Sequence, residues 1–174
     1  MTDLRYPIGT FEPPVRSEPY ERQARIAQIA QAPAALRRVV SGLSDAQLDT
    51  PYRPGGWTVR QVAHHLPDSH LNAYMRMRLA LTEDEPAIKS YAEERWAELP
   101  DARGAPVELS LALLDALHAR WMLLLGALEP VHFARAYRHP EMGRVPLDMA
   151  IALYAWHGRH HVAHISTLRE RMGW

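Results

Sequence analysis

The sequence predicts an all-α protein built as a four-helix bundle. Four long segments carry apolar residues at helical spacing, and an acidic connection separates the second from the third. No region shows the clear alternation of strands, and helices of this kind bury their apolar faces against one another. The 174 residues fit one domain, 1–174, and the arm at 1–16 contains three prolines.

The first helix is expected to begin after Ser17, because serine caps helices and proline at position 19 suits a first turn. Its apolar residues recur from Ile26 to Leu43. Pro33 lies inside this pattern and should kink or interrupt the helix, because proline lacks a backbone N–H. Residues 44–47 form a capping box for one short turn.

The second helix is expected to start near Thr58, which forms a capping box with Gln61. Pro67 should kink it near His65. Residues 83–105 are acidic and interrupted by prolines and a glycine. They indicate a long connection with a short helix over 91–98.

The second half of the chain predicts the remaining two helices. One is expected over 107–128 and the other over 147–172, because both segments have an apolar face at helical spacing. Between them, residues 133–145 contain a proline and a glycine and indicate a loop or a small hairpin.

Composition limits the possible functions. The 20 basic and 20 acidic residues give no net charge, so the usual electrostatic signature of a nucleic-acid binder is missing. The chain has no cysteine, which rules out disulfides, a protein thiol nucleophile and cysteine metal sites. No apolar run reaches the roughly 18 residues of a membrane span, and no signal peptide is recognisable. We therefore expect a cytoplasmic protein that binds neither nucleic acid nor membrane.

Histidines are the unusual feature, with ten in the chain and four between positions 157 and 164. His157 and His161 are one helical turn apart, differ by only about 40° around the axis and lie within the apolar face. Two imidazoles at this spacing can share a metal ion. His160 and His164 have the same spacing and remain a rival pair.

The second helix offers a third ligand. His65 lies at the edge of the buried stripe, whereas His64 is rotated about 200° from Val62 and is expected to point outward. Three neutral imidazoles leave a coordination position open, as in catalytic sites, and both zinc and nickel suit imidazole. Asp68 is either an acceptor that orients a ligand or a surface acid.

Several stretches together resemble the DinB/YfiT-like family of metal-binding four-helix bundles. They are Tyr6-Pro7-Ile8-Gly9, LDTPYRPGGWTVRQVAHHLPDSH at 48–70, LTEDEPAI at 81–88, LYAWHGRHHVAHI at 153–165 and RMGW at 171–174. The resemblance implies an up-down-down-up bundle, often a homodimer. In this family the metal ligands are one histidine of the HHL stretch and two histidines of the last helix that are four residues apart. Carried over, these are His65, His157 and His161. Pro67 departs from the alanine expected there.

The resemblance also implies one divalent metal ion per subunit, zinc or nickel, and two kinds of chemistry. Members of this branch are described as metal-dependent hydrolases, and the branch is similar to bacillithiol S-transferases. An open metal position can hold a thiol as the nucleophilic thiolate, which favours transfer of a small-molecule thiol to an electrophile. A hydrolase would activate water instead and would need a nearby general base. Asp68 is the candidate, because it is the acid nearest in sequence to one of these histidines. A non-catalytic metal- or ligand-binding stress protein is the third alternative.

Overall fold

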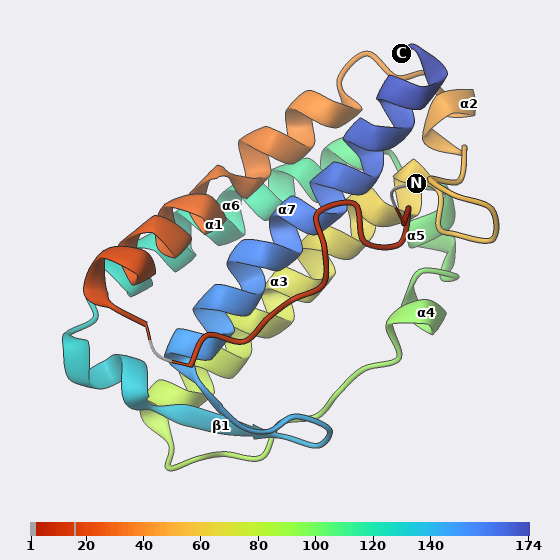
Figure 1. Cartoon of the computed structure of the whole chain (residues 1–174). Coiled ribbons are helices and arrows are strands. Elements are labelled where there is room, and N and C mark those ends of the chain that lie inside the picture. Colours follow the sequence, from red (N-terminus) through yellow and green to blue (C-terminus); the bar gives the residue numbers. More distant parts are fainter. Residues whose placement is uncertain (1–2, 16) are drawn as a thin grey trace.

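Four long helices form the body of the molecule. The structure, a computed structural model, describes residues 3–15 and 17–174, so residues 1, 2 and 16 of the expected arm lie outside the described residues. The long helices are α1 (Pro19–Val40), α3 (Val59–Thr82), α6 (Val107–Gly126) and α7 (Leu147–Met172). Figure 1 shows that α3 and α6 run opposite to α1 and α7, which gives the predicted up-down-down-up arrangement.

The order of helices around the bundle places parallel helices next to each other, α1 beside α7 and α3 beside α6. α7 packs between α1 and α3, and α6 packs between the same two helices on the other side. Because α3 and α6 run in the same direction, the chain must return along the bundle between them (Figure 1). That return carries two short helices, α4 (Glu93–Trp96) and α5 (Pro100–Gly104).

Local capping chemistry sets where the helices begin. Ser44 caps the short α2 (Asp45–Leu48) with Gln47, and Thr58 caps α3 with Gln61, as the sequence predicts. The first helix differs, because its N-cap is Glu18 and not Ser17. The Glu18 N–H donates to the Glu21 carboxylate at 3.0 Å, while Ser17 Oγ accepts from Arg25 at 2.7 Å.

Neither helix with an internal proline ends at it. α1 continues through Pro33 and α3 through Pro67. Each proline still removes one helical N–H, so the carbonyl four residues earlier loses its usual partner.

The segment before the last helix is a hairpin and not only a loop. It follows the short 3-10 helix η1 (Pro130–Ala134) and consists of β1 (Ala136–His139) and β2 (Gly143–Pro146). The strands are antiparallel, with Tyr137 opposite Val145. Gly143 has a φ of +68°, a conformation that glycine adopts without a Cβ penalty.

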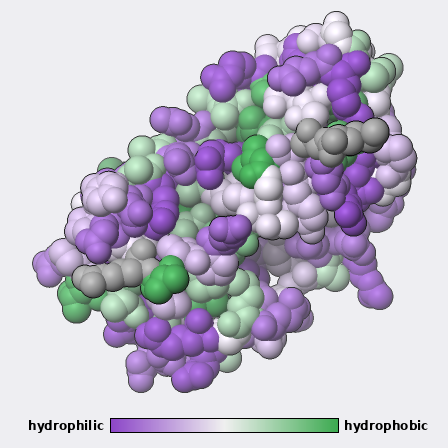
Figure 2. Space-filling model, in the orientation of Figure 1, coloured by the Kyte–Doolittle hydropathy of each residue, from purple (hydrophilic) through white to green (hydrophobic). Residues whose placement is uncertain are grey.

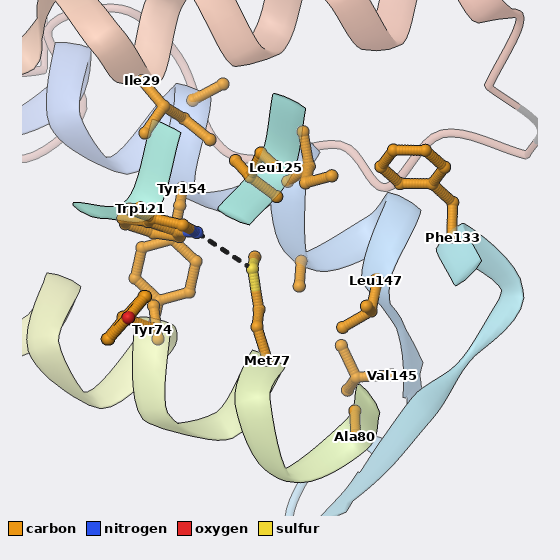
Figure 3. Packing of buried hydrophobic residues seen from close by; sticks show 14 of the residues in the cluster. Ile29, Tyr74, Met77, Ala80, Trp121, Leu125, Phe133, Val145, Leu147 and Tyr154 are labelled. Atoms are coloured by element: carbon orange, nitrogen blue, oxygen red, sulfur yellow. Dashed lines mark hydrogen bonds between the residues drawn. The ribbon is translucent and has the colours of Figure 1, made fainter. Parts of the chain in front are cut away.

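Two apolar clusters fill the interior, one toward each end of the bundle. Figure 3 shows the first, in which the Trp121 indole donates to the Met77 sulfur at 3.3 Å. The second is built around Leu36, Leu66, Leu114 and Ile165. Between them, α3, α6 and α7 carry polar residues inward: His65, His70, His118, His157 and His161. The bundle interior is therefore interrupted by a layer of histidines.

The surface and the arm complete the fold. The arm lies along α7 (Figure 1), and Figure 2 shows that this face is mainly polar with small apolar patches. α6 is long and apolar enough to cross a membrane by length and composition alone. In this fold it is a bundle helix whose Leu114 and Trp121 are fully buried.

Candidate metal centre

The structure brings His65, His157 and His161 together. One ring nitrogen from each lies within 4.8 Å of the others. His65 Nε2 and His157 Nε2 are 3.4 Å apart, although 92 residues separate them in sequence. α3 provides the first histidine and α7 the other two, so the packing of these two helices creates the cluster.

The donor set fits a divalent metal ion. Zinc–nitrogen bonds of about 2.0–2.1 Å at tetrahedral angles hold two nitrogens about 3.3 Å apart, close to the His65–His157 separation. Burial lowers the pKa of His65 to about 4 and the pKa values of His157 and His161 well below the ordinary value. The imidazoles are therefore neutral at pH 7 and keep the lone pair that a metal requires.

Aromatic and polar side chains surround the three nitrogens. The Trp57 ring lies 4.8 Å from the His65 ring and 6.4 Å from the His161 ring, measured between centroids. Ser69 Oγ lies 3.3 Å from His157 Nε2. Trp57 thus shields one side of the cluster, and Ser69 places a hydroxyl beside it.

The second nitrogen of His157 begins a chain of buried histidines that sequence reasoning missed. His157 Nδ1 lies 3.3 Å from His70 Nε2, and His70 Nδ1 lies 2.8 Å from His118 Nε2. His118 Nδ1 lies 3.0 Å from the carbonyl oxygen of Ile29. One sequence signal was present, because His118 falls within the apolar stripe of α6 beside Leu117 and Trp121.

The rival pair faces the N-terminal arm. His164 Nε2 lies 3.1 Å from the Arg5 carbonyl oxygen, and the His164 ring stacks on Tyr52 at 4.0 Å. The His160 ring stacks on Trp156 at 4.3 Å and contacts Tyr6 of the arm at 6.0 Å. The structure therefore joins His157 and His161 to His65, and uses His160 and His164 to hold the arm.

His64 does not point outward, contrary to the sequence prediction. It is only 6% exposed, and its ring nitrogens lie 2.7 Å from Ser110 Oγ and 3.1 Å from the Ala105 carbonyl oxygen. His64 would point outward only if α3 had a single buried face. The helix is instead covered by α7 on one side and by α5 and α6 on another, so both neighbouring histidines are buried.

Asp68 is not brought to the histidine cluster. It lines a separate cavity with His64 and Asp101, where burial raises its pKa to about 6. Among residues 3–15 and 17–174, no carboxylate forms a hydrogen bond or ion pair with His65, His157 or His161.

A cavity of about 460 Å³ reaches the cluster at His157. Its floor includes Ser69 and Arg76 of α3 and Tyr154 of α7, and the return segment supplies the outer wall. The Arg76 guanidinium donates to the Lys89 carbonyl at 3.1 Å, which ties this wall to α3. Glu93, Glu94 and Glu141 also line the cavity. The space suits a small molecule with polar groups.

Comparisons with known proteins agree with this architecture. The model of the DinB superfamily matches residues 28–165. Proteins of Bacillus mycoides (strain KBAB4) and Bacillus cereus (strain ATCC 10987 / NRS 248) are 53% and 52% identical over 176 residues, with 100% of each chain covered. Both carry the name "Putative metal-dependent hydrolase".

Two solved structures are also similar. YfiT from Bacillus subtilis, described as a probable metal-dependent hydrolase with an unusual four-helix bundle topology, has 48% identity and a TM-score of 0.96 over 98% of both chains. TT2238, described as a four-helix bundle protein, has 21% identity and a TM-score of 0.61. The match covers 84% of this chain and 98% of that one, and at this identity it shows the fold alone.

Proposed function

The chain belongs to the DinB superfamily, and from this premise we propose that it is a metal-dependent enzyme that transfers a low-molecular-weight thiol to an electrophile. His65, His157 and His161 hold one divalent ion, zinc or nickel. The thiol is of the bacillithiol type, and the reaction takes place in the cytoplasm of the cell. The observation that supports this proposal most directly is a cluster of three neutral imidazoles, which no carboxylate of the residues that the structure describes contacts.

The absence of a contacting carboxylate favours a thiol over water as the nucleophile. A divalent ion at this site would lower the pKa of a bound thiol, whose ordinary value near 8.5 is already close to neutral. A thiol therefore needs no protein base in contact with the cluster. The chain has no cysteine, so the sulfur comes from a cosubstrate.

The protein's own side chains bind and orient the reactants. The three histidines fix the position of the ion, and Trp57 keeps water from one side of them. The cavity beside His157 receives the electrophile, with Ser69, Arg76 and Tyr154 as its polar contacts. Holding both reactants together replaces a bimolecular encounter by a local one.

The chemical step balances without an oxidant or reductant. The thiol loses its proton to solvent, and the sulfur forms a bond to the electrophilic carbon. The leaving group, chloride for a chloronitrobenzene, departs with the electron pair of the broken bond. The products are a thioether, a proton and a halide ion.

The test is a conjugation assay with purified, metal-loaded protein, bacillithiol and a chloronitrobenzene or bimane electrophile. We expect thioether formation by the wild-type protein, and loss of it in metal-stripped protein and in His161→Ala. His164→Ala is the matched control, because it removes an imidazole one turn further along α7 that faces the arm. Conjugation that survives His161→Ala would sink the metal-thiolate proposal.

A hydrolase is the second candidate, and one feature of the cavity favours it. Glu93 lines the cavity that reaches His157, and partial desolvation there raises its pKa although the residue is still exposed to solvent. A carboxyl with a raised pKa is a suitable general base for water. Ester or amide hydrolysis in the absence of thiol, abolished by Glu93→Gln, would support this candidate instead.

In the same assay, tight ligand binding without turnover would support a non-catalytic binding protein.

The family resemblance also leads us to propose a homodimer, which size-exclusion chromatography with light scattering would detect as twice the 19.8 kDa chain mass.

A further inference from the structure

Pro33 frees one backbone carbonyl in the centre of α1. In an uninterrupted helix, the Ile29 carbonyl accepts the N–H of residue 33. Proline has no N–H, so this carbonyl needs another donor, and Ile29 is fully buried away from water. His118 Nδ1 lies 3.0 Å from it and is the group that satisfies it.

A carbonyl accepts hydrogen bonds and cannot donate them. This fixes the direction of every hydrogen bond in the histidine chain, which runs from His157 through His70 and His118 to the Ile29 carbonyl. His118 must carry its proton on Nδ1. In a neutral ring the other nitrogen, Nε2, is then an acceptor, so the His70 Nδ1–H donates to it at 2.8 Å. By the same rule His70 Nε2 is an acceptor, and the His157 Nδ1–H donates to it at 3.3 Å.

We propose that the Ile29 carbonyl, freed by Pro33, sets the tautomer of His157 through His118 and His70, and so presents the lone pair of His157 Nε2 to the metal site. His118 and His70 are positioning residues for this ligand. Their role toward an ion rests on the proposed metal centre, whereas the tautomer is a property of the metal-free protein.

Burial keeps each ring of the chain neutral. His70 is fully buried, and both of its ring nitrogens lie against the rings of other histidines and not against a carboxylate. Desolvation lowers the pKa of His118 to about 4. A neutral ring has one donor and one acceptor, which a directional chain requires.

Tight packing prevents the His70 ring from turning over. Trp121 and Tyr154 meet it edge to face, with centroids at 5.8 Å and 5.4 Å. On the α7 side, a Cβ at Gly158 would lie 3.2 Å from Ala32 Cβ and 3.5 Å from His70 Cε1. Glycine thus lets α7 approach α1 while leaving room for this ring.

The deciding experiment reads tautomers directly in metal-free protein. Two-dimensional ¹⁵N NMR of labelled imidazoles separates protonated from unprotonated ring nitrogens at pH 7.5 or above. We expect His157, His70 and His118 all to be protonated on Nδ1. A metal-free wild-type protein with His157 protonated on Nε2 would overturn the proposal, whether or not the protein is a thiol transferase.

Substitutions at His118 test whether the histidine chain controls the tautomer of His157, the proposed metal-ligating residue. Leucine removes the link, whereas glutamine can still donate to Ile29 and accept from His70. We expect His118→Leu to give mixed His157 tautomers and about 10–100-fold weaker metal binding, the range typical of groups that orient a ligand. His118→Gln should restore Nδ1 protonation and most of the affinity.

His64→Leu is the matched control, because it deletes a buried histidine whose two hydrogen bonds go to Ser110 and Ala105 and do not belong to the histidine chain. We expect it to lower stability while leaving the His157 tautomer and metal affinity as in the wild type. Equal losses of affinity in His64→Leu and His118→Leu would mean that general destabilisation, and not the chain, explains the effect. If His118→Leu does not fold, the wild-type tautomers still decide.

Discussion

The two histidine pairs of α7 have the same spacing and opposite surroundings. His157 and His161 face inward and meet His65, whose ring is 5.4 Å and 4.7 Å from theirs. His160 and His164 face the arm, where His164 contacts a backbone carbonyl and a tyrosine ring. The inner pair turns ring nitrogens toward the third histidine, whereas the outer pair packs on aromatic rings and the arm, with His160 Nδ1 and His164 Nδ1 lacking a hydrogen-bond partner among the described residues. The i, i+4 spacing makes a metal site possible, and the neighbouring chain segments decide whether one forms.

The largest expected contrast concerns metal binding. Replacing His157 or His161 with alanine should lower metal affinity by more than about 100-fold, because loss of a direct ligand exceeds the 10–100-fold typical of supporting groups. The same change at His160 or His164 should leave affinity close to that of the wild type. Competition with a chromophoric chelator measures both. Comparable losses from the two pairs would erase the distinction between them.

The pH dependence of stability is the second contrast. His118 has a folded pKa of about 4, below its ordinary 6.5, so on acidification the unfolded chain takes up the proton first. The free energy of unfolding of the metal-free protein should therefore fall between pH 6.5 and 4, by about 3 kcal/mol for this group alone. The buried ligands act with the same sign. Asp68 acts with the opposite sign over nearly the same range, because its pKa is raised from 3.8 to about 6, so the net slope is smaller than that of the histidines alone.

Urea denaturation from pH 8 to pH 4 measures this slope. His118→Leu should flatten the curve, because the substituted residue no longer titrates. His164→Leu should flatten it less, since burial opposes protonation of His164 while its contact with the Arg5 carbonyl favours it. A curve unaffected by His118→Leu would contradict the assignment of this slope.

Detaching the arm should affect the outer pair alone. Trp156 donates to the Gly9 carbonyl at 3.3 Å and packs on Phe11 and His160. Trp156→Ala should cost about 1–2 kcal/mol and lower Tm by about 2–8 °C, because it removes half-buried ring contacts and one hydrogen bond. Calorimetry gives the change in Tm. Metal affinity should not change, and a large loss of affinity would show that the arm supports the inner pair too.

The smallest expected effect connects Pro33 with His118. Pro33→Ala supplies an N–H to the Ile29 carbonyl, which matters more when His118 no longer donates to it. We expect Pro33→Ala to be more stabilising in the His118→Leu background than in the wild type, by about 1 kcal/mol. A double-mutant cycle in urea measures this coupling. Strict additivity would mean that the two groups do not share the carbonyl.

Features encoded locally were the ones that the sequence predicted well. The capping boxes at Ser44 and Thr58 depend on residues three positions apart, and they form as expected. The start of α1 was misplaced by one residue, because Ser17 is a preferred N-cap type whereas Glu18 caps the helix through a capping box with Glu21. Four amphipathic segments and a long return predict the bundle, and the family motifs supply the order of its helices.

The surroundings of the histidines were harder to predict because they depend on contacts distant in sequence. His64 was expected to point outward, since a helical wheel cannot reveal that α3 is covered on more than one side. The hydrogen-bonded series from His157 through His70 and His118 to Ile29 joins four helices, and one of its links spans 89 residues. The cavity wall at 90–95 belongs to a segment with little periodicity, so no pattern located it.

The order of helices around the bundle also has a consequence for synthesis. α7 packs against both α1 and α3, and His157 follows its neighbour His65 by 92 residues. At about 5–20 residues per second, a ribosome adds this stretch in about 5–18 s. Once α6 has been made and until α7 has emerged, α1, α3 and α6 expose the apolar groove that α7 later fills. The growing chain therefore passes through an aggregation-prone stage, and the three imidazoles of the candidate metal centre come together only after α7 has emerged.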